Sequence, residues 1–404
     1  MEVVAVDEVR QALLDGRRAL PGVGRVRPGA AGSLPFVVVD DHDVEIAPIS
    51  TFLRDLMLTD MSPLTARSYG HDLLRWWRLL SVLSVPWEHA SRSEVEVLVG
   101  WMRSADNPQR HRRRPAAAPA GSMNRRTGKP SLRQGYAPAT INHALSVLST
   151  FYAFHAQFGH GPVSNPVPVS ASRRARLAHR SPIEAQGEHR RAPLRQKPPV
   201  LLPRAIPDGL FDELVGAMRS HRDRALLALY LSSGARASEL LGVRGEQVDW
   251  TRQQVWVVSK GTRALQPVPA SPEALRHLAC YFDEHGTPAA DEIIWRTLRG
   301  TPRPLPYFAA RRVLQRANAL LGTDWTLHDL RHTTIERMTS DPALSLPDVM
   351  AVSRHQRVSS LDPYLRPRVD DVFERLQRHY TQPRPAQTLT PGYDAADFRT
   401  VFGG

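Results

Sequence analysis

The sequence predicts a mainly helical protein with a small β-hairpin or sheet, divided into a helical first domain and an α+β second domain. Through most of residues 48–158, apolar residues recur at a spacing near 3.6, which is typical of amphipathic helices. Residues 253–270 instead alternate apolar and polar side chains around a Ser-Lys-Gly-Thr turn, as a hairpin does. A chain of 404 residues with a basic, proline-punctuated stretch near its middle is typical of two or three domains.

Composition points to a polyanionic partner. The formal net charge is +13, and the basic residues are nearly all arginine, since the lysines are Lys129, Lys197 and Lys260. Such a charge attracts nucleic acid over a long range. The single cysteine, Cys280, excludes an intramolecular disulfide, which suits a reducing cytoplasm. Because neither a signal peptide nor a long apolar run is present, we expect a cytoplasmic protein with no membrane segment.

The helical domain is expected over residues 46–166, after an N-terminal extension at 1–45. That extension contains no recognisable chemistry, and it is expected to be flexible or loosely docked. Cap residues and apolar spacing predict four helices, at 49–60, from Ser62-Pro63, from Ser91 or Ser93, and at 137–158 with Thr140 as the cap.

The second of these helices presents a basic face. Its predicted buried stripe contains Leu64, Tyr69, Leu73 and either Trp76 or Trp77. Arg67, His71 and Arg75 lie mainly outside that stripe. A plain helical bundle would explain the pattern, but the charged face favours a bundle that binds DNA through these three side chains.

Two segments interrupt the compact pattern. Residues 103–135 combine an arginine run with Pro, Ala, Gly and Ser, and we interpret them as a mobile basic insertion between helices. Residues 167–200, which include Arg173 and Arg174, are predicted to be a basic interdomain linker. Both could be merely solvated charge. Near DNA they would neutralise phosphates without reading sequence.

The second domain is expected over residues 201–382, followed by a C-terminal tail at 383–404. The hairpin at 253–270 lies inside it. Apolar periodicity predicts helices at 207–218, 221–233, 238–241, 272–284, 307–321 and 369–382.

Six residues of this domain would suit the transfer of a phosphodiester to a tyrosine without metal: Arg236, Lys260, His328, Arg331, His355 and Tyr364. Arginine forks can hold the non-bridging oxygens of a transition state that gains negative charge. Tyrosine can be the nucleophile, but its reference pKa of about 10 means that a proton acceptor must help it ionise. A lysine on a hairpin can protonate the leaving 5′ oxygen.

Each of these residues, taken alone, has an ordinary explanation. Arg236 could be a surface arginine at a helix start. His328 and His332 have the H-x₃-H spacing of a zinc-binding helix, but no third ligand is evident, so no metal site is expected. His332 is instead expected to pack in a supporting role. Tyr380 is a rival to Tyr364 for any role that needs a tyrosine.

Order and spacing together resemble those of the tyrosine recombinase (phage integrase) family over roughly residues 45–380. The family's Gly-x-Arg-x-Ser-Glu-Leu box is matched by SGARASELLGV, which assigns its arginine to Arg236 and its acidic companion to Glu239. The Lys-Gly-x-Lys/Arg turn of the family's hairpin is matched by SKGTRALQPVP, at Lys260 and Arg263.

The family's His-x-x-Arg-His box appears as HDLRHT, with His328, Arg331 and His332. Its second histidine precedes the nucleophile by nine residues, and His355 and Tyr364 keep that interval. The resemblance therefore assigns the nucleophile to Tyr364.

One position departs from the family's pattern. The family usually has glycine before the second histidine, where it allows a tight helix end, and this chain has Arg354. We expect Arg354 to alter the local turn or to add a phosphate contact.

The resemblance implies a SAM-like helical core-binding domain joined to an α+β tyrosine recombinase catalytic domain. It also implies that DNA is cut and rejoined through a 3′-phosphotyrosine and a Holliday junction, with no metal, ATP or other cofactor. The partners would be double-stranded DNA recombination sites and a homotetramer assembled on them from two dimers. A type IB topoisomerase-like enzyme and a catalytically inactive DNA-binding relative are the alternatives. Whether the protein is an integrase, a transposase or a resolvase stays open.

Overall fold

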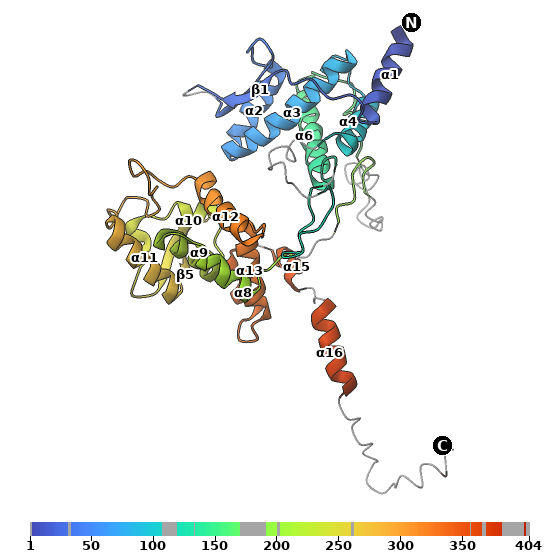
Figure 1. Ribbon diagram of the computed structural model, residues 1–404. Helices are drawn as coiled ribbons and strands as arrows, with labels where there is room; N and C mark the ends of the chain where they lie inside the picture. The colour runs from blue at the N-terminus through green and yellow to red at the C-terminus, as the bar shows by residue number, and fades with distance from the viewer. Residues whose placement is uncertain are drawn as a thin grey trace, which may run out of the picture. The chain divides into compact units, whose positions relative to one another are not determined.

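The protein, a computed structural model, forms two compact units, Met1–Leu201 and Leu202–Gly404. Figure 1 shows the helices and strands of the two units along the chain. The structure describes residues 2–30, 34–106, 119–132, 134–169, 191–199, 203–259, 262–355, 357–365, 369–381 and 400. Among the helices of these residues, none has both the length and the apolar character that crossing a bilayer needs.

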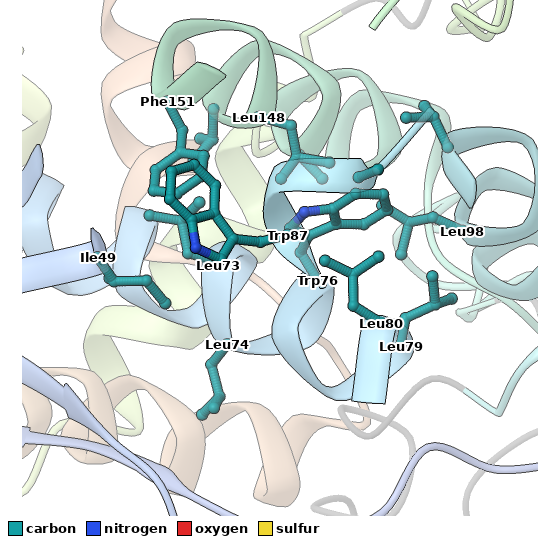
Figure 2. Close-up of a cluster of buried hydrophobic side chains, with 14 of the residues drawn as sticks. Ile49, Leu73, Leu74, Trp76, Leu79, Leu80, Trp87, Leu98, Leu148 and Phe151 are labelled. Atoms are coloured by element: carbon teal, nitrogen blue, oxygen red, sulfur yellow. The ribbon is translucent and has the colours of Figure 1, made fainter. Parts of the chain in front are cut away.

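The first unit is built around a long central helix, α3. Its elements are α1 (Glu2–Leu14), β1 (Arg25–Pro28), β2 (Phe36–Val39), α2 (Ala47–Leu58), α3 (Pro63–Leu83), η1 (Trp87–His89), α4 (Arg92–Ser104) and α6 (Pro138–Gln157). Figure 2 shows the core, where Trp76 of α3 lies near Leu148 of α6 and Leu98 of α4.

Local sequence explains where these helices begin. Pro63 occupies the first turn of α3, as predicted, and Ser62 is the N-cap residue, although its side chain makes no capping hydrogen bond. In α4 the Ser91 amide donates to the Glu94 carboxylate at 2.8 Å, in a capping box. The predicted cap at Thr140 is wrong: α6 begins earlier, at Pro138, because proline has no amide proton to satisfy and its φ suits a first turn.

The predicted buried stripe of α3 is right at its centre and wrong at its start. Leu73 and Trp76 are each 1% exposed, whereas Leu64 is 64% exposed. Leu64 lies in the first turn, ahead of Ala66, which is the first buried residue of the helix. Spacing alone therefore extended the stripe one turn too far.

The prediction that residues 1–45 are loosely docked is wrong. Strand β2 pairs antiparallel with β1 and contacts α3, and α1 contacts α4. Val38 is fully buried. The sheet can approach α3 closely because Gly70 has no side chain; a Cβ there would lie 3.1 Å from Val38 Cγ2. Arg78 of α3 donates to the Val23 carbonyl at 2.6 Å and the Gly24 carbonyl at 2.8 Å, which ties the incoming chain to the helix.

Parts of the two basic segments are also structured. Within the insertion, Met123 and Pro130 form an isolated antiparallel bridge. At the end of the predicted linker, the amide of Gln196 donates to the Asn142 side-chain oxygen of α6 at 2.8 Å, and Arg195 donates to the Asn142 carbonyl at 2.9 Å. An asparagine side chain thus satisfies the backbone of an extended segment on the helix surface.

The second unit contains helices around a three-stranded antiparallel sheet of order β3-β4-β5. Its elements are α8 (Asp208–Gly216), α9 (His221–Ser233), α10 (Ala237–Leu241), η2 (Gly245–Gln247), β3 (Val248–Asp249), β4 (Gln254–Val258), β5 (Leu265–Pro269), α11 (Pro272–His285), α12 (Tyr307–Leu321), α13 (Leu327–Ser340), α14 (Leu346–Ser353), η3 (Val358–Ser360), α15 (Asp362–Leu365) and α16 (Val369–Thr381). The predicted hairpin is β4-β5, with Val258 paired to Leu265. The apolar helix α9 packs against α11 and α13, and thereby holds α13 in place.

Candidate active site

Contacts between separate elements bring together most of the predicted catalytic residues. They come from the start of α10, the first turns of α13, the turn after α14, and α15: Arg236, His328, Arg331, His355 and Tyr364. Helix α13 supplies the central part. The Thr326 hydroxyl accepts from the Asp329 amide, and the Asp329 carboxylate accepts from the Thr326 amide at 2.8 Å, so the helix begins in one defined register.

Arg331 is the buried centre of the site, at 3% exposure. Its guanidinium donates to the Gly234 carbonyl and, at 2.6 Å, to the Ser353 carbonyl. It also lies 3.3 Å from His355 Nε2. Burial, reinforced by the positive charge of Arg236, lowers the pKa of Arg331 to about 10, so the group stays charged at neutral pH.

Gly234, whose carbonyl accepts from Arg331, shapes the turn between α9 and α10. It ends α9 in the left-handed region, at φ 57°, which directs the chain into the Arg236 turn. A Cβ at Gly234 would lie 3.2 Å from Thr334 Cγ2 of α13. The glycine therefore serves both the turn and the close approach of α9 to α13.

Glu239 joins two further arginines, and its side chain is 1% exposed. Arg236 donates to one carboxylate oxygen at 2.9 Å, and Arg354 donates to the other at 2.8 Å. The Arg236 amide also donates to Glu239, at 2.8 Å. These contacts fix the Arg236 side chain, which is 34% exposed and so remains able to meet a ligand.

Arg354 performs the turn that glycine usually makes. It ends α14 in the left-handed region, with φ 56° and ψ 42°. Its side chain is 5% exposed and pairs with Glu239. The local turn is therefore kept, and the guanidinium is paired with a buried carboxylate.

His355 is held as a neutral imidazole. Its Nδ1 lies 3.0 Å from the Ser353 hydroxyl and its Nε2 faces a donor nitrogen of Arg331. Burial first, and then the charge of Arg331, lower the pKa of His355 to about 4. With Nε2 accepting from Arg331, the ring proton lies on Nδ1 and can be donated to Ser353.

Tyr364 contacts His332, not His328 or His355. The Tyr364 hydroxyl is hydrogen-bonded to His332 Nδ1, and the rings of His332 and His328 are packed edge to face with centroids 4.2 Å apart. Burial, followed by the neighbouring His328, lowers the pKa of His332 to about 4. Burial raises the pKa of Tyr364 to about 12. The ground state is therefore a neutral phenol donating to a neutral imidazole.

His328 is exposed at the edge of the site. Desolvation by its surroundings and the charge of Arg331 lower the pKa of His328 below its usual value. A neutral, accessible imidazole beside Arg331 can donate or accept a hydrogen bond to a bound ligand.

Some of the remaining predicted residues lie outside the described part of the chain: Lys260, Arg173 and Arg174. Arg263 is described, and it takes a left-handed φ of 55° in the hairpin turn. Tyr380, the rival tyrosine, is 76% exposed on α16, where its ring faces His379.

The basic face of α3 is only partly available. Arg67 and His71 are exposed, and the Arg67 guanidinium lies 5.7 Å from the Phe36 ring. Arg75, however, pairs with the buried Asp72 at 2.5 Å, and its side chain is 17% exposed. Arg75 therefore stabilises the first unit more directly than it offers a DNA contact.

Sequence reasoning underrated His332 and missed Ser353. The i, i+4 spacing of His328 and His332 places both rings on one face of α13, which was the available signal for His332. No sequence signal pointed to Ser353, whose carbonyl and hydroxyl contact Arg331 and His355. Among the described residues, no three histidine, cysteine or carboxylate side chains are grouped so that they could hold a metal ion.

Comparison with known proteins shows which proteins this chain is similar to. Residues 209–370 match the sequence profile of the phage integrase family. The tyrosine recombinase XerD of Lacticaseibacillus casei is 24% identical over 246 residues, which are 56% of this chain and 72% of that protein. The tyrosine recombinase Synpcc7942_B2651 of Synechococcus elongatus is 24% identical over 357 residues, which are 83% of this chain and 94% of that one. Two further tyrosine recombinases are matched over 53% and 46% of their own length.

The fold has a counterpart among solved structures. A lambda integrase dimer bound to a COC′ core site superposes with a TM-score of 0.52 at 13% identity, covering 80% of this chain and 95% of that one. The likeness spans both units and shows a shared mainly helical fold. The family profile and the recombinase relatives thus identify residues 209–370 as a segment of the phage integrase family, in a chain that is similar to tyrosine recombinase enzymes.

Proposed function

We propose that the protein is a site-specific recombinase that cuts and rejoins double-stranded DNA through a 3′-phosphotyrosine at Tyr364. The observation that carries the proposal is the contact of the Tyr364 hydroxyl with His332, one residue after the buried Arg331. A nucleophile, a proton acceptor and a permanent cation are thereby held at one place.

The arginines are proposed to bind the scissile phosphate. Arg331 stays charged at neutral pH and Arg236 is partly exposed, so the two can share the non-bridging oxygens. The exposed His328 would add a hydrogen bond to the same group. His355, whose two ring nitrogens face Arg331 and Ser353, would act by holding Arg331. Each such preorganised donor typically contributes roughly 10²–10³ in rate.

Proton movement follows from the pKa values. With a pKa of about 12, only roughly one Tyr364 in 10⁵ is ionised at pH 7, so the hydroxyl proton must leave as the oxygen attacks. His332 Nδ1 is the acceptor in contact. A bound phosphate would partly cancel the arginine charges, and this would make His332 a better base.

The step balances without any other reactant. The Tyr364 oxygen bonds to phosphorus, the phosphorus–O5′ bond breaks, and the 5′ oxygen takes a proton, for which Lys260 is the proposed donor. Attack by the 5′ hydroxyl of a partner duplex reverses the sequence and completes strand exchange through a Holliday junction. The ester energy is kept in the phosphotyrosine, so no ATP is consumed.

Recombination needs more than one copy on DNA, and we propose that four copies assemble as two dimers in the cytoplasm. The matched lambda integrase structure is a dimer bound to a core site. In this chain, α16 carries Phe373, Leu376 and Tyr380 at 59%, 37% and 76% exposure. Their i, i+3, i+7 spacing places them on one helix face, which suits packing against a neighbouring copy.

The test uses nicked duplexes with a randomised core, so that the preferred site need not be known beforehand. Protein–DNA adducts are isolated under denaturing conditions, and the retained strand is sequenced. We expect adducts that keep the 3′-phosphate side, release a 5′ hydroxyl and form equally well in excess EDTA. Adducts through the 5′ phosphate would contradict the proposal.

The selected site is then placed on two plasmids. Exchange between the plasmids supports a recombinase. Relaxation of a supercoiled plasmid without exchange would indicate a topoisomerase-like enzyme, and DNA binding without any adduct would indicate an inactive relative.

A further inference from the structure

Arg204 makes an unusually complete set of contacts for a residue that precedes the first helix of its unit. Its guanidinium donates to Asp329 at 2.5 Å and to Asp324 at 3.2 Å. The same group lies 4.8 Å from the centre of the Trp325 ring. The Arg204 side chain is 20% exposed and that of Asp329 10%, so these charges are largely shielded from water. Both ends and one face of a single guanidinium are thus used on the start of α13.

Asp329 is the important partner, because it also starts the helix. The same carboxylate oxygen that receives Arg204 accepts from the Thr326 amide and hydroxyl, each at 2.8 Å. Two residues beyond Arg204, the Ile206 amide donates to the buried Thr333 hydroxyl at 2.9 Å. Residues 204–206 therefore hold α13 at two successive positions along one side.

The same turns of α13 carry the site residues. At about 100° per residue, Arg331 projects opposite the face that Asp329 and Thr333 share, whereas His332 lies about 60° from Asp329 around the helix axis. A helix held rigidly along one side has a fixed rotation about its axis. That rotation decides whether His332 meets the Tyr364 hydroxyl.

We infer that Arg204 is a positioning residue for the covalent step, which it serves by fixing the rotation of α13 about its axis. This inference rests on the proposed function. Arg204 makes no hydrogen bond to Tyr364 or His332. It acts through Asp329 and the helix, and its charge is also a minor cause of the lowered pKa of His332, an effect that Arg204→Lys retains. A displacement of about 1 Å at reacting groups can cost on the order of 10²-fold in rate.

A matched control is built into the same helix. Arg337, at the other end of α13, pairs with Asp208 of α8 and lies 5.6 Å from the Phe211 ring. This is again an arginine with a carboxylate and an aromatic ring, between the same two parts of the chain. It is 39% exposed and lies beyond the turns that carry the site residues.

The experiment compares the full-length protein with Arg204→Gln, Arg204→Lys and Arg337→Gln on one nicked duplex recovered from the randomised pool. Duplex affinity, the single-turnover rate of adduct formation and the melting temperature are measured for each. We expect Arg204→Gln to form the adduct on the order of 10²-fold more slowly, while its duplex Kd stays within about twofold. Arg204→Lys should recover part of the rate, because it keeps the charge beside Asp329 but loses the fork and the ring contact.

Arg337→Gln should form the adduct within about twofold of the unchanged protein. Equal adduct rates for Arg204→Gln and Arg337→Gln would overturn the inference, as would a loss in which Kd rises as much as the rate falls. If Arg204→Gln does not fold, the Lys variant decides: a folded Lys variant with a full rate removes the positioning role. Absence of any adduct from the unchanged protein would instead overturn the proposed function, and the role of Arg204 with it.

Discussion

At the scale of single residues, the site keeps its histidines uncharged. Burial and the nearby Arg331 hold the pKa of His355 at about 4, and burial with His328 holds that of His332 at about 4. An unfolded histidine has a pKa of about 6.5. As pH falls below that value, the unfolded chain takes up protons that the folded site takes up only near pH 4. The stability contributed by neutral histidines is therefore full above about pH 6.5 and is lost as pH falls toward 4.

We therefore expect His355→Gln and His332→Gln to reduce the loss of unfolding free energy between pH 7 and pH 5, each by on the order of 1 kcal/mol. Urea denaturation at several pH values measures this. His42→Gln is the control, because the His42 side chain is 82% exposed. An unchanged pH dependence in both site variants would show that the two histidines are protonated as easily in the folded protein as in the unfolded chain.

Local spacing predicted some features of the site but not its contacts. His355 and Tyr364, which the sequence placed nine residues apart, contact the adjacent residues Arg331 and His332 of α13. The contact between Tyr364 and His332 depends on how η3 and α15 return to α13, and local spacing does not encode that path. The two-sided role of Glu239 was likewise hidden, because its second partner, Arg354, is 115 residues away.

At the scale of elements, the turn after α14 has Arg354 in an unfavourable left-handed backbone conformation, and the side chain of that residue makes a stabilising ion pair. A left-handed arginine costs on the order of 1 kcal/mol relative to glycine. Its buried ion pair with Glu239 offsets this cost. We expect Arg354→Gly to lower the unfolding free energy by roughly 1–2 kcal/mol, although glycine suits the turn better, because Glu239 loses a buried partner.

Denaturant unfolding of Arg354→Gly, Glu239→Gln and the double variant measures this coupling as a double-mutant cycle. A more stable Arg354→Gly protein would mean that backbone strain outweighs the ion pair.

The N-terminal layer, formed by α1, β1 and β2 within residues 1–45, is the part of the fold that the sequence did not predict. The run Phe36–Val39 is apolar but short, and Gly/Pro-rich sequence surrounds it. What makes it part of the core is the space left by Gly70 on α3, which comes more than thirty residues later in the chain. Helices with their own caps, such as α3 and α4, were predictable because the signals are local.

If that layer is part of the core, Val38→Ala should cost roughly 2 kcal/mol of unfolding free energy, from lost burial and the cavity left behind. Val44→Ala, in the same region but at a 60% exposed position, should change it by less than about 0.5 kcal/mol. If chemical denaturation shows equally small losses of unfolding free energy for both variants, residues 1–45 are loosely docked after all.

At the scale of the whole molecule, a net charge of +13 should govern how the protein approaches DNA. We expect the logarithm of the binding constant to fall steeply with the logarithm of salt concentration, with a slope of magnitude about 4 or more. Arg67→Gln should reduce that magnitude by about 1, because Arg67 is exposed on α3. Arg17→Gln, which removes an exposed arginine that pairs with Asp15, is the control. A flat salt dependence would exclude phosphate-dominated affinity.

Tyr364 is proposed to carry the covalent bond to DNA. Adduct formation on the selected nicked duplex, compared between the unchanged protein, Tyr364→Phe and Tyr380→Phe, tests this proposal most directly. We predict that Tyr364→Phe binds the duplex with unchanged affinity and forms no adduct, while Tyr380→Phe forms the adduct. An adduct from Tyr364→Phe, or its loss in Tyr380→Phe alone, would contradict the assignment.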